Sequence, residues 1–162
     1  MKWFGVLLLI TSVLSACKGV ESDDKDVQFS EVSSYDSTLA VKWGADDYGM
    51  RSYVFALLTS GADSLLSAEE RSAIGQAHLA HIQSLSESGK LILAGPFYEA
   101  KNYRGIFIFN TDDIDEAQTW VAADPAVQAE ILNAELLPWY GSAALVEVPE
   151  LHRKVEKVNP AE

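Results

Sequence analysis

The chain has 162 residues, a formal net charge of −12 and 48% hydrophobic residues, and Cys17 is its single cysteine. A chain this acidic repels phosphate groups, so we expect neither a nucleic-acid partner nor attraction to anionic lipid head groups. One cysteine excludes an intramolecular disulfide.

The first residues predict a secretory signal peptide, residues 1–16. Lys2 gives a basic start, an apolar run extends over 3–13, and small residues follow. The run is too short to span a membrane. The letters "LSAC" at 14–17 resemble the lipobox of bacterial lipoproteins, in which the cysteine thiol accepts a diacylglyceryl group. The alternative is an ordinary signal peptide with a chance cysteine, but the order of these features favours lipidation of Cys17.

We therefore expect a mature protein that begins at Cys17 and is held on a membrane by acyl chains. Its place would be the cell envelope, facing the periplasm. In lipoproteins generally, an Asp after the lipidated cysteine is associated with retention in the inner membrane. Lys18 stands at that position, which favours the outer membrane if the organism is Gram-negative.

Residues 17–49 are predicted to form an acidic tether from the lipidated cysteine. They mix acids, Ser and Gly without sustained hydrophobic periodicity, which argues against a packed core. The alternative is that Leu39, Val41 and Trp43, at alternate positions, dock on the domain as an edge strand.

Residues 50–147 are predicted to form one domain, which starts with a buried strand over 51–60. Ser67 and Glu70 then form a capping-box pattern, which opens a helix that extends to about Ser88. A second apolar strand follows over 90–97, where Gly95 and Pro96 end it.

Two further strands are expected in the second half of the domain, over 104–110 and 135–146. Between them, Thr111 or Asp112 is predicted to cap a second helix. Asp124 and Pro125 end that helix and start a short further one, because Asp caps well and Pro suits the first helical position. Residues 148–162 are predicted to be a C-terminal tail or short helix.

The expected order β-α-β-β-α-β predicts an α+β fold, a two-layer sandwich of the ferredoxin-like kind. The strands are apolar at nearly every position, as in "YVFALL" and "GIFIF", which indicates that both faces of the sheet are buried. A domain of this size cannot cover both faces alone. We therefore expect a homodimer in which two sheets pack face to face.

Over residues 51–140 the chain resembles the YCII family of small dimeric α+β-barrel proteins. The resemblance is carried by "AHLAHIQSLSESGKLILAGPF" followed by "GIFIFNTDDIDEAQTWVAADPAVQAEI". The matching positions occur in the family's order: His78-Leu79, Gly89, Leu91, Gly95-Pro96, Glu116-Ala117 and Asp124-Pro125.

The resemblance implies that His78 and Asp124 form the active site. Three positions near the pair, Gly75, Ala126 and Glu130, depart from the family pattern. Gly75 stands where many members have Arg, and Arg71, one turn further back, is the candidate substitute in substrate binding. Ala126 stands where the family often has an aromatic residue. These changes alter the surroundings of His78 and Asp124, so the substrate need not be the same as that of other family members.

The helical period by itself places both His78 and His81 on the stripe that faces the sheet. On one interpretation His78 is a general acid or base, because imidazole titrates near neutral pH and a carboxylate fixes its tautomer. On the other, it is a core histidine with one hydrogen bond, and Asp124 is only a helix cap. For His81 we expect a packing role.

We expect no metal and no cofactor. His78, His81 and Asp124 could supply three ligands, but helical two-histidine motifs use a spacing of four with a Glu between. The sequence has no Gly-rich phosphate loop. Tyr98 and Tyr103 flank the hairpin after Gly95 and Pro96 and are candidates for the rim of a substrate pocket.

Two functions fit these observations. The first is a lipid-anchored envelope enzyme that uses the His-Asp pair for proton transfer on a small organic molecule. By resemblance to the wider dimeric α+β-barrel group, this would be a cofactor-free activity of the lyase or isomerase kind. The alternative is a non-catalytic dimer that binds a small ligand or serves as a scaffold in the envelope.

Overall fold

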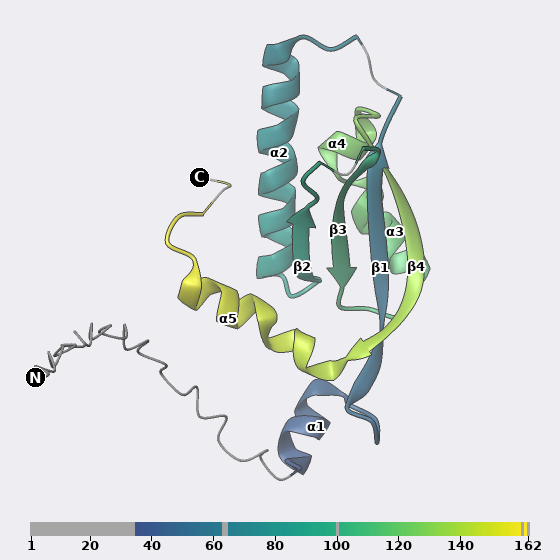
Figure 1. The fold of residues 1–162 in the computed structure, drawn as a ribbon, viewed down its shortest axis with the longest axis vertical. Coiled ribbons are helices and arrows are strands. Elements are labelled where there is room, and N and C mark those ends of the chain that lie inside the picture. Colours follow the sequence, from purple (N-terminus) through teal and green to yellow (C-terminus); the bar gives the residue numbers. More distant parts are fainter. Residues whose placement is uncertain (1–34, 63–64, 100, 160, 162) are drawn as a thin grey trace, which may run out of the picture. The chain divides into compact units, whose positions relative to one another are not determined.

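The computed structural model describes residues 35–62, 65–99, 101–159 and 161 (Figure 1). The predicted signal peptide, the lipobox with Cys17 and the first part of the predicted tether lie outside these residues. The strands are β1 (Met50–Ser60), β2 (Leu91–Pro96), β3 (Tyr103–Phe109) and β4 (Leu132–Ser142). The helices are α1 (Ser37–Trp43), α2 (Ala68–Glu87), α3 (Ile114–Ala122), α4 (Pro125–Gln128), the 3-10 helix η1 (Ala143–Glu147) and α5 (Val148–Val155).

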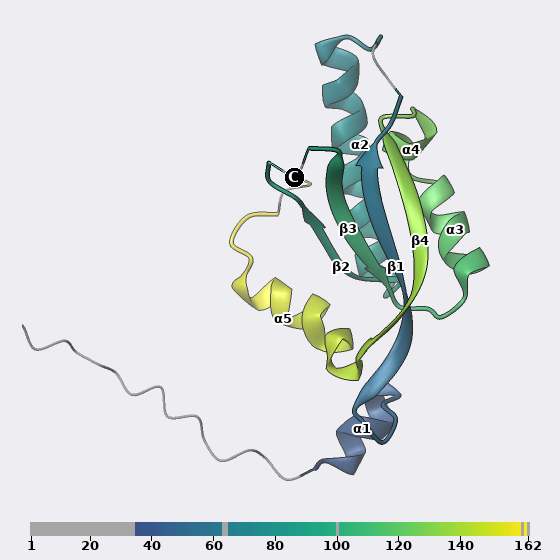
Figure 2. The ribbon, with the colours of Figure 1, turned by 45° about the vertical axis from the view of Figure 1, so that its right-hand side comes forward.

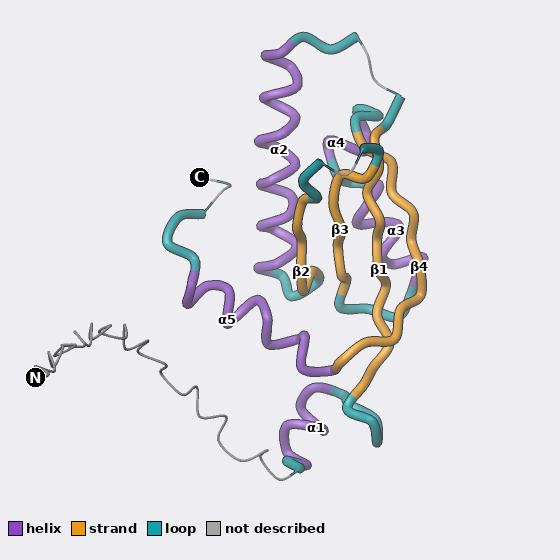
Figure 3. The backbone as a smooth tube through the Cα atoms, in the orientation of Figure 1, coloured by secondary structure: helices purple, strands orange, loops and turns teal. Residues whose placement is uncertain are grey.

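The four strands form one antiparallel sheet in the order β2-β3-β1-β4, with α2, α3 and α4 against one face (Figures 2 and 3). From β1 to β4 the predicted sequence of elements is confirmed, with the short α4 between the second long helix and the last strand. The fold is α+β and ferredoxin-like. Among the described helices, none has the length and apolar character that crossing a membrane requires.

Local signals explain where the helices begin and end. Ser67 and Glu70 form the predicted capping box on α2. Gly89 follows that helix with φ of 73°, a left-handed conformation that glycine adopts without strain. The prediction for α3 was wrong: Asp113, rather than Thr111 or Asp112, accepts the first backbone N–H groups. Thr111 lies two residues earlier, and its hydroxyl accepts the N–H of Asp113 itself.

The main core lies between the sheet and the helices. The side chains of Val54, Ala56 and Leu58 alternate along β1 and are at most 3% exposed. Phe107 and Phe109 of β3 stand beside them, and the ring of Phe109 meets that of Trp120 on α3 at 5.6 Å. The helix-facing residues therefore follow the period of two that a strand with one buried face requires.

The opposite face of the sheet is covered in part by the chain's own C-terminal segment. Tyr53, Ile92 and Ile108 are buried there against residues of η1 and the first turn of α5: Leu145, Val146 and Val148. The expectation that only a second copy could cover this face was wrong, because residues 143–146, predicted as the end of the last strand, belong to η1 and pack on this face. Leu137 and Trp139 on β4 remain 41% and 37% exposed.

Residues 35–49, predicted as part of the tether, are a structured part of the domain. Asp36 caps α1 through the N–H groups of Thr38 and Leu39, and Gly44 ends it with φ of 66°. The alternative of an edge strand was also wrong, since these residues are helical. The helix stays in place because its last residue, Trp43, reaches η1 at the other end of the chain.

Candidate active site

The structure brings His78 and Asp124 into direct contact. His78 lies in the middle of α2, and Asp124 in the turn between α3 and α4. The Nδ1 atom of His78 is 2.8 Å from Oδ2 and 2.9 Å from Oδ1 of Asp124. Forty-six positions separate the two residues in the sequence. The contact that the family resemblance implies is therefore present, while a catalytic role for it stays a prediction.

The carboxylate of Asp124 is held by the backbone around it. Asp124 is the N-cap of α4, and its Oδ1 accepts the N–H of Ala126 at 2.9 Å. Pro125 occupies the first helical position, where its fixed φ favours the turn. Asp124 is 0% exposed. The N–H of Ala126 and the imidazole of His78 both donate to this buried carboxylate, so its orientation toward the imidazole is fixed.

The His78 ring lies at the boundary between the core and solvent. Its side chain is 18% exposed, and its ring centroid is 6.1 Å from that of Phe107 on β3. With an ionised Asp124, Nδ1–H is the donor, so the neutral ring carries its free lone pair on Nε2. The geometry thus orients the basic nitrogen away from the carboxylate, as a general base requires.

His81, one turn further along α2, has a different partner. Its Nε2 donates to the backbone carbonyl of Trp120 at 3.0 Å. This carbonyl belongs to the last turn of α3, where carbonyl groups lack helical partners. Gln128 of α4 caps the next such group by donating to the carbonyl of Ala122 at 3.0 Å. His81 therefore fastens the end of α3, which leads directly into the turn with Asp124.

The other predicted site residues lie in exposed positions. Arg71 is exposed near the start of α2, two turns before His78. Tyr98 and Tyr103 are 88% and 52% exposed at the hairpin between β2 and β3. The ring of Tyr103 meets that of Phe97 at 6.4 Å. A role for these three residues in substrate binding stays a prediction.

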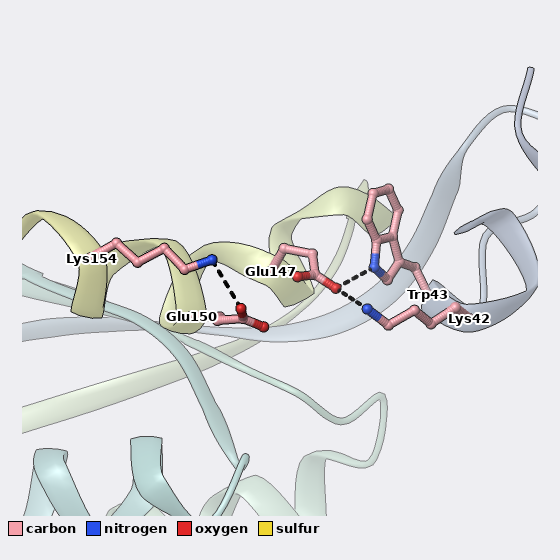
Figure 4. A network of polar contacts seen from close by, with 5 residues as sticks. All are labelled: Lys42, Trp43, Glu147, Glu150 and Lys154. Carbon is pink, nitrogen blue, oxygen red and sulfur yellow. Dashed lines mark hydrogen bonds and ion pairs between the residues drawn. The ribbon is translucent and has the colours of Figure 1, made fainter. Parts of the chain in front are cut away.

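A second group of polar contacts joins α1 to η1 (Figure 4). Oε1 of Glu147 accepts hydrogen bonds from Nζ of Lys42 at 2.6 Å and from Nε1 of Trp43 at 2.7 Å. These bonds hold the pKa of Glu147 below its usual range, and the bond to Glu147 raises the pKa of Lys42. We call these three residues the terminal clamp. Glu150 and Lys154 pair beside it, at 3.0 Å.

An open hollow of about 510 Å³ lies beside the clamp, lined in part by Lys42, Asp46, Arg51 and Tyr140. The phenol of Tyr140 donates to the carboxylate of Asp46 and lowers the pKa of that carboxyl group. His78 and Asp124 do not line this hollow. Within the described ranges, no three His, Cys, Asp or Glu side chains converge in a way that could hold a metal ion.

These observations define a class of protein. It is a ferredoxin-like α+β domain in which an imidazole is hydrogen-bonded to a buried carboxylate. The chain belongs to the family of YCII-related domain proteins, whose model matches residues 53–140. The match extends from β1 to β4 and includes His78 and Asp124, while α1, η1 and α5 lie outside it.

Two curated relatives match the same part of the chain. Both are named protein YciI, one from Escherichia coli O6:H1 and one from Shigella flexneri. Each is 36% identical over 78 residues, which is 43% of this chain and 76% of the relative.

The similar solved structures include the 5-chloro-2-hydroxyhydroquinone dehydrochlorinase TftG from Burkholderia phenoliruptrix AC1100, in complex with 2,5-dihydroxybenzoquinone. It is 25% identical, covers 52% of this chain and 92% of its own, and has a TM-score of 0.39. A TM-score this low carries no argument about the chemistry of this chain.

Proposed function

We propose that the chain is a lipid-anchored envelope protein whose YCII-related domain transfers protons on a small organic molecule. The observation that supports catalysis is the hydrogen bond between Nδ1 of His78 and the buried, backbone-held carboxylate of Asp124. Such a carboxylate fixes the tautomer of the ring and stabilises the imidazolium that forms during the reaction.

The proposed chemistry needs only the two side chains and the substrate. Nε2 of His78 takes a proton from a C–H or O–H acid of the substrate, and the electron pair of that bond stays on the substrate as an enolate or alkoxide. The proton on the imidazolium then returns to a different atom of the substrate, or to a leaving group. The net result is an isomerisation or an elimination. A well-placed acid–base group of this kind accelerates a reaction by about 10²–10⁴-fold.

A deuterium-exchange assay tests proton transfer before the natural reaction is known. The protein is incubated in D₂O with a panel of small cyclic and acyclic carbonyl compounds and phenols, and loss of C–H signals is followed by NMR. Wild-type protein should exchange at least one compound, and His78→Gln should not. Asp124→Asn keeps the cap but removes the charge, and should slow exchange by roughly 10⁴-fold at most.

The same assay separates catalysis from binding. If a compound binds wild-type protein and His78→Gln equally and neither exchanges it, the domain is a ligand-binding or scaffold protein and the catalytic proposal fails. His81→Gln is the matched control, because a side-chain amide can still donate to the carbonyl of Trp120 while His78 is untouched.

The anchor and the dimer are separate parts of the proposal. The basic start, apolar run and lipobox-like "LSAC" support acylation of Cys17, at the outer membrane if the organism is Gram-negative. Mass spectrometry of the N-terminal peptide tests it, with Cys17→Ser as the control.

The partly exposed Leu137 and Trp139 support a homodimer through the open part of the sheet. Leu137→Glu should then shift sedimentation in detergent from dimer to monomer.

A further inference from the structure

The C-terminal helix concentrates positive charge in an otherwise acidic chain. Of the 12 Lys and Arg residues in the sequence, three lie between 153 and 157: Arg153, Lys154 and Lys157. All three are exposed. With Glu150 and Glu156, residues 148–158 have a net charge of +1, whereas the whole chain has −12. The net charge of the chain therefore does not describe this surface.

The same segment exposes apolar side chains. Leu151 is 55% exposed, and Val155, one helical turn later, is 80% exposed. Val158, just after the helix, is 76% exposed. Val148, at the start of α5, packs toward the sheet and leaves these three to solvent. Single exposed apolar residues are ordinary, but three within eight residues and next to three cations are the pattern of a helix that lies on a lipid surface.

The terminal clamp places this helix near the point where the chain enters the domain. Glu147, directly before α5, binds Lys42 and Trp43 of α1 (Figure 4). Figures 1 and 2 show α1 and the start of α5 at the same end of the domain. Eighteen positions separate Cys17 from Tyr35, where the described domain begins. Even fully extended, they span at most roughly 65 Å.

The candidate active site lies toward the other end of the sheet. Asp124 starts α4, which leads into Leu132 at the beginning of β4. Leu132 pairs with Ser60 at the end of β1, whereas α1 precedes the start of β1 at Met50. If α5 rests on the membrane to which the N-terminus is attached, the site lies at the end of the sheet that faces away from that membrane.

We propose that α5 and the residues up to Val158 rest on the anionic phospholipid surface of the membrane. Leu151, Val155 and Val158 enter the boundary between head groups and acyl chains. Arg153 and Lys157 face lipid phosphates together with Lys154, whose ammonium also pairs with Glu150. This inference rests on the proposed lipid anchor, because a single short helix binds a bilayer weakly. A covalent anchor makes the contact intramolecular and raises the effective concentration of the helix at the surface.

The test uses the full, lipidated protein in vesicles, with an environment-sensitive fluorophore on Val155→Cys. Acylation blocks the thiol of Cys17, so the introduced cysteine is the only one that reacts. The matched control carries the label on Tyr98→Cys, which is 88% exposed on the β2–β3 hairpin. We expect a blue shift at position 155 with phosphatidylglycerol vesicles, a smaller one with phosphatidylcholine, and none at position 98.

A second experiment tests how much the three cations contribute to membrane contact. High salt, or the combination of Arg153→Gln, Lys154→Gln and Lys157→Gln, should reduce the blue shift at position 155 in phosphatidylglycerol vesicles. An acylated protein whose label at 155 shows the same emission in both vesicles and without lipid overturns the inference and leaves the anchor standing. A concentration-dependent shift in detergent without lipid also overturns it, since a second copy then covers α5. A Cys17 with a free thiol overturns both the lipid anchor and this inference, and leaves the proposed proton transfer to its own assay.

Discussion

Two carboxylates organise the two ends of this domain in different ways. Asp124 is 0% exposed and is oriented by the N–H of Ala126 at the start of α4. The side chain of Glu147 is 24% exposed and is held by two flexible side chains, Lys42 and Trp43. Asp124 lies inside the family match and Glu147 outside it. A carboxylate that the backbone holds in one orientation can orient a catalytic side chain. A carboxylate held by side chains can instead join two segments that are far apart in the sequence.

Among substitutions that test this comparison, the largest loss of stability is expected at Asp124. Asp124→Ala removes the cap of α4 and the partner of His78 together, and should lower the free energy of unfolding by about 3 kcal/mol. Asp124→Asn keeps the cap and should lower it by about 1 kcal/mol. Urea denaturation followed by tryptophan fluorescence measures both. Equal losses for the two variants would show that the cap of α4 contributes nothing to stability beyond the charge of Asp124.

A smaller effect is expected at His81. His81→Ala leaves the carbonyl of Trp120 without its donor and should cost about 1 kcal/mol of stability. His81→Gln should restore most of that loss, because its amide can donate to the same carbonyl. Denaturation of the three proteins under identical conditions measures this. If the alanine variant is as stable as wild type, His81 does not fasten the end of α3.

The stability of the terminal clamp should depend on pH, because its two charged groups are titratable. The hydrogen bond from Lys42 lowers the pKa of Glu147, so the clamp is complete above the usual value of 4.5 and is lost as pH falls through the lowered pKa. The pKa of Lys42 is raised above 10.5, so at alkaline pH the clamp is lost only as pH rises through that raised value.

Hydrogen exchange of the α1 amides measures the clamp directly. It should accelerate at acidic pH, beyond the intrinsic change in exchange rate, and it should accelerate at neutral pH in Glu147→Ala. The α2 amides around His78 are the internal control and should be unaffected by that variant. Equal acceleration in both helices would mean that the two regions are coupled.

The smallest expected effect concerns the hydrogen bond between Tyr140 and Asp46. The phenol is the main cause of the lowered pKa of the Asp46 carboxyl group. In Tyr140→Phe that pKa should rise toward its usual value, without change in the fold, because Asp46 still accepts the backbone N–H groups of Tyr48 and Met50. An NMR titration of the carboxyl carbon shows this shift, and an unchanged pKa would contradict the assignment.

The element order was predictable because its signals are local. The capping box of Ser67 and Glu70, the glycine at 89 and the pair Asp124-Pro125 act within a few residues of each other. Local signals could not choose among Thr111, Asp112 and Asp113, since each can accept hydrogen bonds at that helix start. The contact of His78 with Asp124 spans 46 positions, and the family resemblance supplied it where periodicity could not.

The missed features depend on distant partners. The helix α1 is fastened by Glu147, which follows Trp43 by 104 positions, so a search for periodicity in 17–49 had no means of finding it. Likewise, His81 gained a role only when α3 was placed against α2. The covering of Tyr53 by η1 and α5 also required the tertiary structure. The flanks of the domain were thus harder to predict than its centre.

The central claim is that Asp124 holds His78 as an oriented base. The most direct measurement is the ¹⁵N NMR spectrum of the His78 ring at a pH where it is neutral, in wild type and in Asp124→Asn. The structure predicts a proton on Nδ1 and a free lone pair on Nε2 in wild type, with this preference lost or weakened in the variant. A wild-type ring protonated on Nε2, or a variant with a tautomer preference as strong as that of wild type, would contradict the claim.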